Sequence, residues 1–387
     1  MEFDIVIAGG GPAGLSLACA LGGSGLSVAV VERAPDAELA APAFDGREIA
    51  LTHRSVDLLR TLGAWAHIPA DEISEMREAR VLNGGSLYAM SFTAGAGGEP
   101  LGHLVANHLI RTALYRTASA IEGVTLLTGI AVAGIETSAD GVRVRLADGR
   151  TLGARLAVAA DTRFSELRRR QGIAARTQDF GRVMMVCRVE HALPHDHVAT
   201  EWFDYGQTIA MLPINGNRSS FVLTLPAGEM DAVMAMDTDE FSAEATRRYR
   251  ERLGPMRLIS TRHAYPLVAV YAERFVSTRF ALLGDAAVGM HPVTAHGFNF
   301  GLRGAASLAR HIRAAKGDIG AAAVLQAYQR EHRRATLPTY AATNATARLY
   351  SDERLPARLL RDTILRLGNL AAPVRGLITA RLMEKAS

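Results

Sequence analysis

The chain has 387 residues, a length that favours two lobes over one, and with 49% hydrophobic and 21% charged residues it is expected to be globular. Its net charge of +4 is modest, and basic and acidic residues are interspersed up to about residue 345, which excludes a nucleic-acid-binding stripe. No apolar run reaches the roughly 18 residues that a membrane span needs.

The two cysteines, Cys19 and Cys187, are far apart and lie in apolar contexts. Neither a disulfide framework nor a cysteine metal site is expected, and a reducing cytoplasm fits this cysteine usage. The start, "MEFDIVIAGGGPAGLSLACALG", lacks a basic leader and is interrupted by glycines. It therefore predicts a strand and a helix rather than a signal peptide.

The first thirty-two residues are typical of a βαβ unit. "DIVIA" predicts a buried strand, "GGGPAG" a turn, residues 12–21 a helix, and "SVAVVE" a second strand. Two further helices are predicted in "SVDLLRTLGAW" and "HLIRTALYRTASAI", because their apolar residues recur at helical spacing and a glycine follows each.

From residue 123 to Asp161 the hydrophobic period drops to two, with Asp-Gly turns, which indicates a layer of hairpins. Short strands separated by one helix, Phe241 to Leu253, predict a mostly antiparallel second lobe between Arg182 and Pro266. After "FALLGDAA" the chain is expected to be helical to its end, and "FTAGAGGEP" at 92–100 to be a mobile loop.

The turn after the first strand has the spacing Gly9-x-Gly11-x-x-Gly14. Gly9 permits a tight turn, Gly11 leaves room for a pyrophosphate, and Gly14 lets helix and strand approach closely. Glu32, at the end of the second strand, is placed to accept hydrogen bonds from a ribose. The pattern predicts a bound adenosine dinucleotide, FAD or NAD, and the acid disfavours NADP.

A second glycine-rich segment lies about 280 residues further on. "RFALLGDAA" is a strand that ends in Gly284-Asp285, where a carboxylate either binds a polyol such as the ribityl chain of a flavin or caps a helix. "HPVTAHGFNFGL", from His291 to Leu302, then opens a helix whose N-terminal N–H groups favour an anionic guest such as a reduced flavin.

These segments, with "GREIALTHRSVDLLRTLGAW" and "AADTRFSELRR", resemble in this order the motifs of the single-component, class A FAD-dependent aromatic hydroxylases (monooxygenases). The His-Pro and Gly-Phe-Asn forms look most like the ubiquinone-biosynthesis branch, and "DTRFS" and "TAHGFNFGL" like its UbiM type, the 5-demethoxyubiquinol 5-hydroxylases. The resemblance spans residues 1 to about 304 and implies an α/β fold. Its parts are a Rossmann-like, para-hydroxybenzoate-hydroxylase-like FAD-binding domain (1–72, 101–180 and 267–345), an antiparallel β-sheet substrate domain (73–100 and 181–266) and a helical C-terminal tail (346–387).

The resemblance also implies which residues bind FAD. Arg47 contacts it from a helix after the second strand, Arg111 lies by the pyrophosphate, and Asp161 belongs to a motif shared by FAD and NAD(P)H. Two positions depart from the family: Asp-Thr replaces Asp-Gly at 161–162, and His296 stands where Gln is common. The full expected set is Gly9, Gly11, Pro12, Ala13, Gly14, Glu32, Arg33, Arg47, Arg111, Asp161, Gly284, Asp285, Pro292, Gly297, Phe298 and Asn299.

In this class, as the resemblance implies, NAD(P)H reduces the flavin, O2 forms a flavin hydroperoxide, and the distal oxygen is transferred to an electron-rich ring. The expected substrate is a polyprenylated phenol or quinol, and no metal is required. A base that deprotonates the phenol would help. Four residues are candidates, each of which is also open to a purely structural interpretation: His291, His296, Tyr205 and Tyr265.

Other functions remain open at this point. A flavin halogenase is disfavoured, because "GAWAHIP" has alanine at both positions that its Trp-x-Trp motif requires. A hydroxylase of a small soluble aromatic acid would use arginines of the second lobe, of which Arg182, Arg188 and Arg218 are available. A non-catalytic FAD-binding scaffold of a biosynthetic complex, and a homo-oligomer, are also left open.

The C-terminal tail carries eight Lys or Arg against four Asp or Glu from Arg348 to Ser387. Leucines at helical spacing with arginines between them predict an amphipathic cationic helix. Such a helix either contacts a partner or an anionic membrane surface, which would make the protein peripheral to the inner membrane, or packs on the FAD-binding domain.

Overall fold

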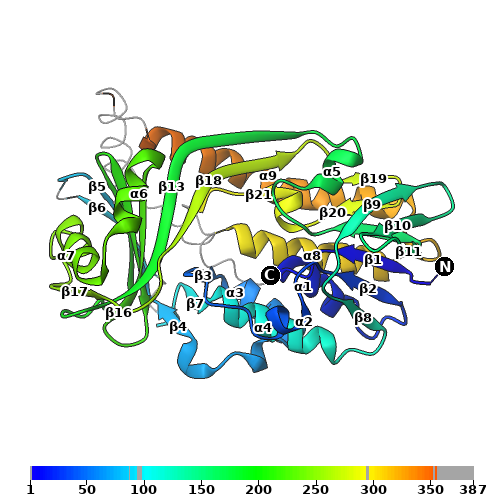
Figure 1. Ribbon diagram of the computed structural model, residues 1–387, viewed down its shortest axis with the longest axis horizontal. Helices are drawn as coiled ribbons and strands as arrows, with labels where there is room; N and C mark the ends of the chain where they lie inside the picture. Colours follow the sequence, from blue (N-terminus) through cyan, green and yellow to red (C-terminus); the bar gives the residue numbers. More distant parts are fainter. Residues whose placement is uncertain (1, 87, 94–97, 293–295, 352–353, 355–387) are drawn as a thin grey trace.

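The computed structural model describes residues 2–86, 88–93, 98–292, 296–351 and 354. Two lobes lie side by side along its long axis (Figure 1). The first lobe is built on a six-stranded sheet in the order β19-β20-β12-β1-β2-β8, parallel except for β19. Its strands are β1 (Ile5–Ala8), β2 (Val28–Val31), β8 (Val124–Leu127), β12 (Leu156–Ala159), β19 (Val276–Ser277) and β20 (Phe280–Leu282).

The predicted βαβ unit is confirmed. Every residue of β1 and β2 is buried, as expected for parallel strands covered on both faces. Between them, α1 (Pro12–Leu21) begins with a proline at its first position and packs against α8 and α4. The helices of this lobe are α1, α2 (Asp36–Ala40), α3 (His53–Thr61), α4 (Asn107–Ser119), α5 (Glu166–Arg170), α8 (Gly297–Arg313) and α9 (Ala322–Ser351), with short 3-10 turns at Trp65–His67, Ala70–Glu72 and Gly284–Ala286.

The hairpin layer expected from residue 123 to 161 is only partly correct. The antiparallel sheet contains just β9 (Val132–Thr137), β10 (Val142–Leu146) and β11 (Thr151–Ala154). The flanking strands β8 and β12 belong instead to the parallel sheet. Each has only four residues, so alternation along the strand is too short to show which sheet it joins.

The second lobe is a large sheet in the order β21-β18-β13-β16-β15-β14-β5-β6, with β17 also paired to β13. All its pairs are antiparallel except β14 with β5, so the expected antiparallel architecture is confirmed. Its strands are β5 (Glu78–Asn83), β6 (Ala89–Thr93), β13 (Ala175–His191), β14 (Val198–Asp204), β15 (Gln207–Ile214), β16 (Arg218–Pro226), β17 (Met256–Leu258), β18 (His263–Ala272) and β21 (Val288–Gly289).

The single helix expected at 241–253 is wrong in its bounds. Two helices occur here, α6 (Ala227–Ala235) and α7 (Thr238–Arg248). A capping box between Asp237 and Glu240 starts α7 earlier, and positive φ angles of 55° and 54° at Arg250 and Glu251 end it before 253.

Strands β13 and β18 run from one lobe into the other (Figure 1). The expected domain boundaries at 180/181 and 266/267 therefore fall inside continuous strands. A small sheet of β3 (Glu48–Leu51), β7 (Gly102–Ala106) and β4 (Ser74–Met76) lies at the junction. There the Arg188 guanidinium lies 2.7 Å from the Glu48 carboxylate, whose side chain is 2% exposed, so this ion pair ties the two lobes together.

The two faces of the large sheet differ. Met185, Cys187 and Val189 of β13 are buried with residues of α6 and α7 in one apolar core. The alternate residues of the same strand point to the first lobe: the Val186 side chain lies against Gly46, and Arg188 reaches Glu48. Any ligand held between the lobes must meet this second face.

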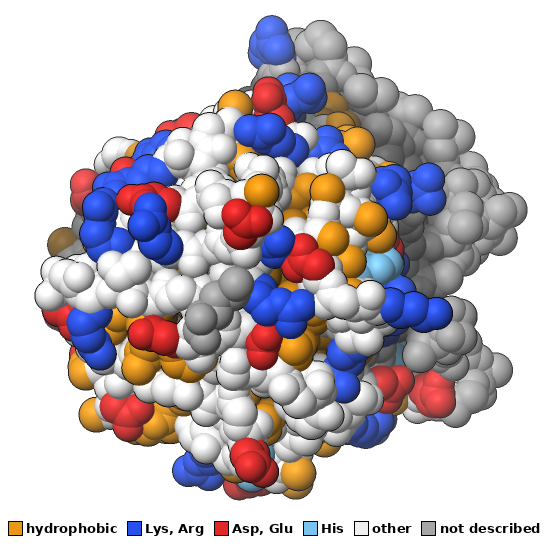
Figure 2. Space-filling model, turned by 90° about the vertical axis from the view of Figure 1, so that its right-hand side faces the viewer, with side chains coloured by type: hydrophobic (Ala, Val, Ile, Leu, Met, Phe, Trp, Pro, Cys, Tyr) orange, Lys and Arg blue, Asp and Glu red, His pale blue; other side chains and the backbone are white. Residues whose placement is uncertain are grey.

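Basic and acidic side chains are interspersed on the end of the first lobe (Figure 2). Both cysteines are buried and unpaired. Among the described residues no helix is long and apolar enough to cross a membrane. Residues 355–387, which carry most of the expected tail, and 94–97 of the expected loop lie outside the described residues.

Candidate functional site

The three glycines of the first turn have different surroundings. Gly9 has a φ of +116°, and a Cβ on it would lie 2.5 Å from the Ala160 carbonyl oxygen. A Cβ on Gly14 would lie 1.9 Å from the Gly9 carbonyl oxygen. A Cβ on Gly11, by contrast, would meet no atom within 4 Å. Gly9 and Gly14 are therefore required by the fold, whereas Gly11 borders open space at the start of α1, where a phosphate group fits.

The Glu32 carboxylate lies beside this turn. It accepts hydrogen bonds from the backbone N–H groups of Gly10, at 2.7 Å, and Ala34, at 3.0 Å. These bonds fix its direction and leave acceptor capacity on both oxygens. Arg33, which follows it, has an exposed side chain.

The two glycine-rich segments meet in space. Gly284 has a φ of +60°, and a Cβ there would lie 2.7 Å from the Ala13 Cβ at the start of α1. Next to it, the Asp285 carboxylate accepts a hydrogen bond from the Arg163 guanidinium at 3.0 Å. Arg163 also donates to the Val268 carbonyl oxygen at 2.9 Å, so β18 supports the pair. The fold thus joins turns about 270 residues apart in the sequence into one site.

The start of α8 is anchored to β3. The buried Asn299 amide donates to the Ala50 carbonyl oxygen at 2.9 Å and accepts from the Thr52 backbone N–H at 3.3 Å. Space is open at Gly297, where a Cβ would meet nothing within 4 Å. Phe298 is partly buried against the first-lobe core, and Pro292 is exposed. Asn299 therefore holds the first turn of α8, and Gly297 is the position that faces free space.

Arg47 was expected on a helix, and that expectation is wrong. It lies in the extended segment that leads into β3, because β2 is followed by the short α2 and an irregular stretch. Its guanidinium pairs with the Asp45 carboxylate at 2.5 Å and lies 5.5 Å from the centre of the Tyr265 ring. Asp45 also accepts from the Asn107 amide of α4 at 2.8 Å. The same helix carries the half-buried Arg111, which makes no hydrogen bond with another described residue.

Asp161 lies directly behind the first turn. Its backbone nitrogen is 3.1 Å from the position that a Cβ on Gly9 would take. Its Oδ1 is buried without a hydrogen-bond partner among the described residues, and burial raises the pKa of the carboxyl. A buried acceptor without a partner is costly, and a bound polar ligand would remove that cost.

The candidate catalytic residues fall into two groups. The Tyr265 hydroxyl donates to the Asp45 carbonyl oxygen at 2.8 Å, next to Arg47. The His291 ring packs edge-on against Phe180 with centroids 4.7 Å apart, and burial lowers its pKa to about 4, so the ring is neutral at pH 7. The His296 ring lies 5.6 Å from that of Phe300 at the start of α8.

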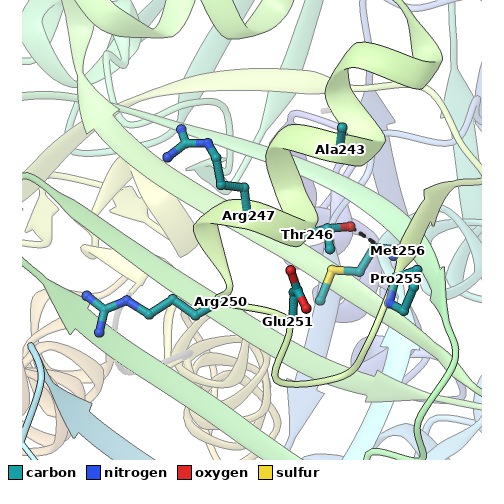
Figure 3. A pocket seen from close by; sticks show the side chains of 7 residues that line it. All are labelled: Ala243, Thr246, Arg247, Arg250, Glu251, Pro255 and Met256. Carbon is teal, nitrogen blue, oxygen red and sulfur yellow. Dashed lines mark hydrogen bonds between the residues drawn. The ribbon is translucent and has the colours of Figure 1, made fainter.

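Tyr205, the fourth candidate, lies at the surface of the second lobe. It lies in the hairpin turn between β14 and β15, is 45% exposed and borders a hollow with Arg247 and Arg248 of α7. A neighbouring surface hollow is lined by residues of α7, by the loop after it, including Arg250 and Glu251, and by Met256 at the start of β17 (Figure 3). Residues of α7 border both hollows, and α7 lies at the end of the second lobe that is far from α1 (Figure 1).

These observations test whether FAD fits the residues present. Open space at Gly11 and Gly297, a carboxylate at each turn and the unpartnered Asp161 oxygen suit a long, polar dinucleotide. A family model described as an FAD binding domain matches residues 2–341. The chain belongs to this family of FAD-binding proteins.

The chain is similar to other proteins over most of its length. It is 45% identical to ubiquinone hydroxylase UbiM of Neisseria meningitidis, over 99% of this chain and 85% of that protein. It is 37% identical to ubiquinone hydroxylase UbiL of Rhodospirillum rubrum, over 92% and 84%. The fold is similar to a crystal structure of PqsL from P. aeruginosa, with a TM-score of 0.76 and 24% identity over 90% of this chain and 97% of that one.

Sequence reasoning missed two features of this candidate site. Arg163 was quoted within a motif but given no role, and its bond to Asp285 spans 122 positions. The contact of Tyr265 with Asp45 spans 220. Both contacts depend on how β18 packs against the first lobe. No local sequence pattern predicts that packing.

Proposed function

We propose that this protein is an FAD-dependent monooxygenase that hydroxylates the aromatic ring of a polyprenylated ubiquinone precursor, of the 5-demethoxyubiquinol 5-hydroxylase type. The observation that carries the proposal is the close approach of Gly284 to Ala13, which supports one continuous site for one extended FAD. The names of the two relatives support the substrate class.

In this proposal the site residues divide along the cofactor. Glu32 binds the adenosine ribose, the N–H groups beside Gly11 and the Arg111 guanidinium bind the pyrophosphate, and Asp285 binds the ribityl chain while Arg163 fixes its direction. We also expect Asp161 Oδ1, which is buried without a partner among the described residues, to accept a hydrogen bond from FAD. When bound, FAD supplies the redox chemistry that activates O2, with NAD(P)H as the proposed electron donor.

The chain's own residues then bind and orient the ring. The N-terminal N–H groups of α8 place partial positive charge beside the flavin end, which favours anionic groups there. The Arg47 guanidinium, which is paired with the Asp45 carboxylate, contacts the cofactor from the segment before β3. Tyr265 holds the Asp45 backbone, and so the Arg47 segment, in position. Burial lowers the pKa of His291 to about 4, so the ring stays uncharged at neutral pH and is a weak base.

The alternative of a small acidic substrate is less well supported. It would require free arginines on the second lobe, but Arg188 is engaged by Glu48 at 2.7 Å and Arg218 donates to the Asn215 carbonyl oxygen at 2.8 Å. Arg182 donates to the Gly206 carbonyl oxygen at 3.1 Å.

Two measurements test the proposal. Mass spectrometry of quinone intermediates in cells lacking the protein should show accumulation of a precursor that lacks one ring oxygen, with its polyprenyl chain intact. The purified FAD-loaded protein should consume NAD(P)H in an oxygen-dependent manner and hydroxylate a short-chain 5-demethoxyubiquinol. An unchanged quinone profile would contradict the assigned pathway, and binding of FAD without any oxygen-dependent NAD(P)H consumption would support a non-catalytic scaffold.

A further inference from the structure

The side chain of Glu201 lies on the face of the large sheet that points to the first lobe. Glu201 of β14 pairs with Ala210 of β15, which pairs with Val222 of β16, and that residue pairs with Val186 of β13. Val186 in turn pairs with His263 of β18. Residues paired across neighbouring strands project from the same face of a sheet, so these five side chains form one row.

Contacts at the His263 end of this row show which lobe the row faces. A Cβ on Gly46, in the segment that carries Arg47, would lie 2.6 Å from the Val186 Cγ2 and 3.1 Å from the His263 ring. The row therefore faces the Arg47 segment of the first lobe. Four strand spacings of about 4.8 Å separate His263 from Glu201, or about 19 Å. Val186, Val222 and Ala210 stand between them, all apolar, and of these three Val222 is the one that keeps accessible surface, next to Glu201's own part of the row.

Part of this face is accessible although it is central in the sheet. Val222 and Thr224 of β16 and Met184 of β13 keep accessible surface, whereas the alternate residues Leu223 and Met185 are fully buried under α6 and α7. Glu201 is likewise partly accessible on this face, while the next residue of its strand is fully buried on the other. Several described residues of this face are thus incompletely covered.

Glu201 makes no hydrogen bond or ion pair with another described residue. Burial raises the pKa of its carboxyl to about 8, so the neutral acid predominates at pH 7. Its neighbours on the same face are apolar: Val81 opposite it, and Ala199 and Phe203 along the strand. Phe203 in turn lies against the Tyr350 ring of α9, with centroids 3.9 Å apart.

The other titratable or charged groups of this face have their own partners. His263 contacts the Thr261 hydroxyl at 2.8 Å, and Tyr265 donates to Asp45. Arg188 is paired with Glu48, and Arg182 donates to Gly206. None of these groups is therefore a counter-ion for the Glu201 carboxyl. A carboxyl group held among apolar residues without a partner is costly unless a ligand completes its hydrogen bonds.

We propose that Glu201 is a substrate-binding residue, which as the neutral acid donates a hydrogen bond to an oxygen substituent of the aromatic ring and so sets which ring carbon faces the flavin. This inference rests on the proposed function, because it takes the ring to lie between the large sheet and the start of α8. It assigns to β14 the role of determining the position of hydroxylation. No proton is consumed in this role, since the carboxyl keeps its O–H bond.

The test compares FAD-loaded wild-type protein with Glu201→Leu, Glu201→Gln and, as a control on the exposed surface of the same lobe, Glu229→Gln. Binding of a short-chain 5-demethoxyubiquinol is followed by the change in flavin absorbance, and hydroxylated product per NAD(P)H consumed is measured separately. Glu201→Leu should weaken binding about tenfold, the loss expected for one hydrogen bond, and lower the yield of product. Glu201→Gln should retain binding, because its amide also donates.

The pH dependence separates this role from simple packing. Wild-type affinity should fall as the pH rises through about 8, where Glu201 loses its proton, and the Glu201→Gln variant should lack this fall. Affinity of Glu201→Leu within about twofold of the wild type would overturn the proposal. If the wild type binds the quinol but makes no hydroxylated product, the proposed function fails, while the binding comparison still decides the role of Glu201.

Discussion

Gly14 lies so close to Gly9 that a Cβ on Gly14 would be 1.9 Å from the Gly9 carbonyl oxygen. Because that neighbour is backbone, it cannot move aside as a flexible side chain would. Three positions before Gly14 in the same turn, Gly11 has a φ of −73° and no atom within 4 Å of the place its Cβ would take. Gly14 is therefore required by the fold, whereas Gly11 leaves space for a ligand.

Substituting each of these glycines with alanine should separate stability from cofactor binding. Gly14→Ala should lower the free energy of unfolding of the FAD-free protein by about 3 kcal/mol or more, because the backbone must shift. Gly11→Ala should change it by less than about 1 kcal/mol, yet weaken FAD binding at least about tenfold, because its methyl group occupies the phosphate space. Urea unfolding and fluorescence titration with FAD measure the two effects.

Gly228→Ala serves as the control for this pair, since its Cβ also meets nothing within 4 Å but it lies on α6 of the second lobe. It should leave FAD affinity unchanged. Equal FAD affinity in Gly11→Ala and the wild type would show that the pyrophosphate does not pass this turn.

Asp285→Ala should remove most of the bound FAD and the yellow colour from the purified protein. The carboxylate is expected to hold the ribityl chain, and loss of a hydrogen bond to a charged group costs about 1.5–3 kcal/mol, or roughly 10–100-fold in affinity. Arg163, now left without its partner, adds to the loss. The FAD-to-protein ratio after purification is the measurement, with Asp148→Ala in an exposed hairpin turn as the control. Stoichiometric FAD at unchanged affinity would show that the ribityl assignment is wrong.

The parts of the site that sequence predicts are those built from neighbouring residues. A turn such as "GGGPAG" contains in itself the reason for its glycines, and the βαβ unit around it followed from periodicity. The bounds of α7 could also have been found, because Asp237 and Glu240 form a readable capping box.

The parts that sequence does not predict depend on register between distant strands. Glu201 faces the first lobe only because β14, β15, β16 and β13 pair as they do, and a shift of one residue would turn it to the opposite face. The Arg188 side chain, available for an acidic substrate on sequence grounds alone, is engaged by Glu48 for the same reason.

Acidification should destabilise the protein through buried histidines. His332 of α9 is 2% exposed, its ring stacks on Tyr328 with centroids 5.6 Å apart, and burial lowers its pKa to about 4. The unfolded chain takes up this proton near pH 6.5, whereas the folded protein does not until about pH 4. The stabilisation is therefore complete above pH 6.5 and is lost as the pH falls through this window, by up to about 3 kcal/mol.

The variant His332→Gln cannot titrate, so its free energy of unfolding should fall less than that of the wild type between about pH 7 and about pH 5. Urea unfolding at both pH values gives the two differences. His67→Gln, at an exposed position, should behave as the wild type does. An equal fall in all three proteins would show that His332 does not contribute.

Residues 355–387, which hold most of the cationic C-terminal tail, lie outside the described part of the chain. From Arg348 to Ser387 the net charge is +4, equal to that of the whole chain, and Leu359, Leu360, Ile364 and Leu367 recur at helical spacing. A cationic amphipathic helix binds anionic membrane surfaces, where a polyprenylated substrate would be found. We therefore expect the full chain to float with anionic liposomes and a variant lacking residues 355–387 to stay behind with normal FAD content. Neutral liposomes provide the control, because the charge attraction is absent there. Equal flotation of both forms, or of neither, would assign the tail to packing within the protein or against a partner.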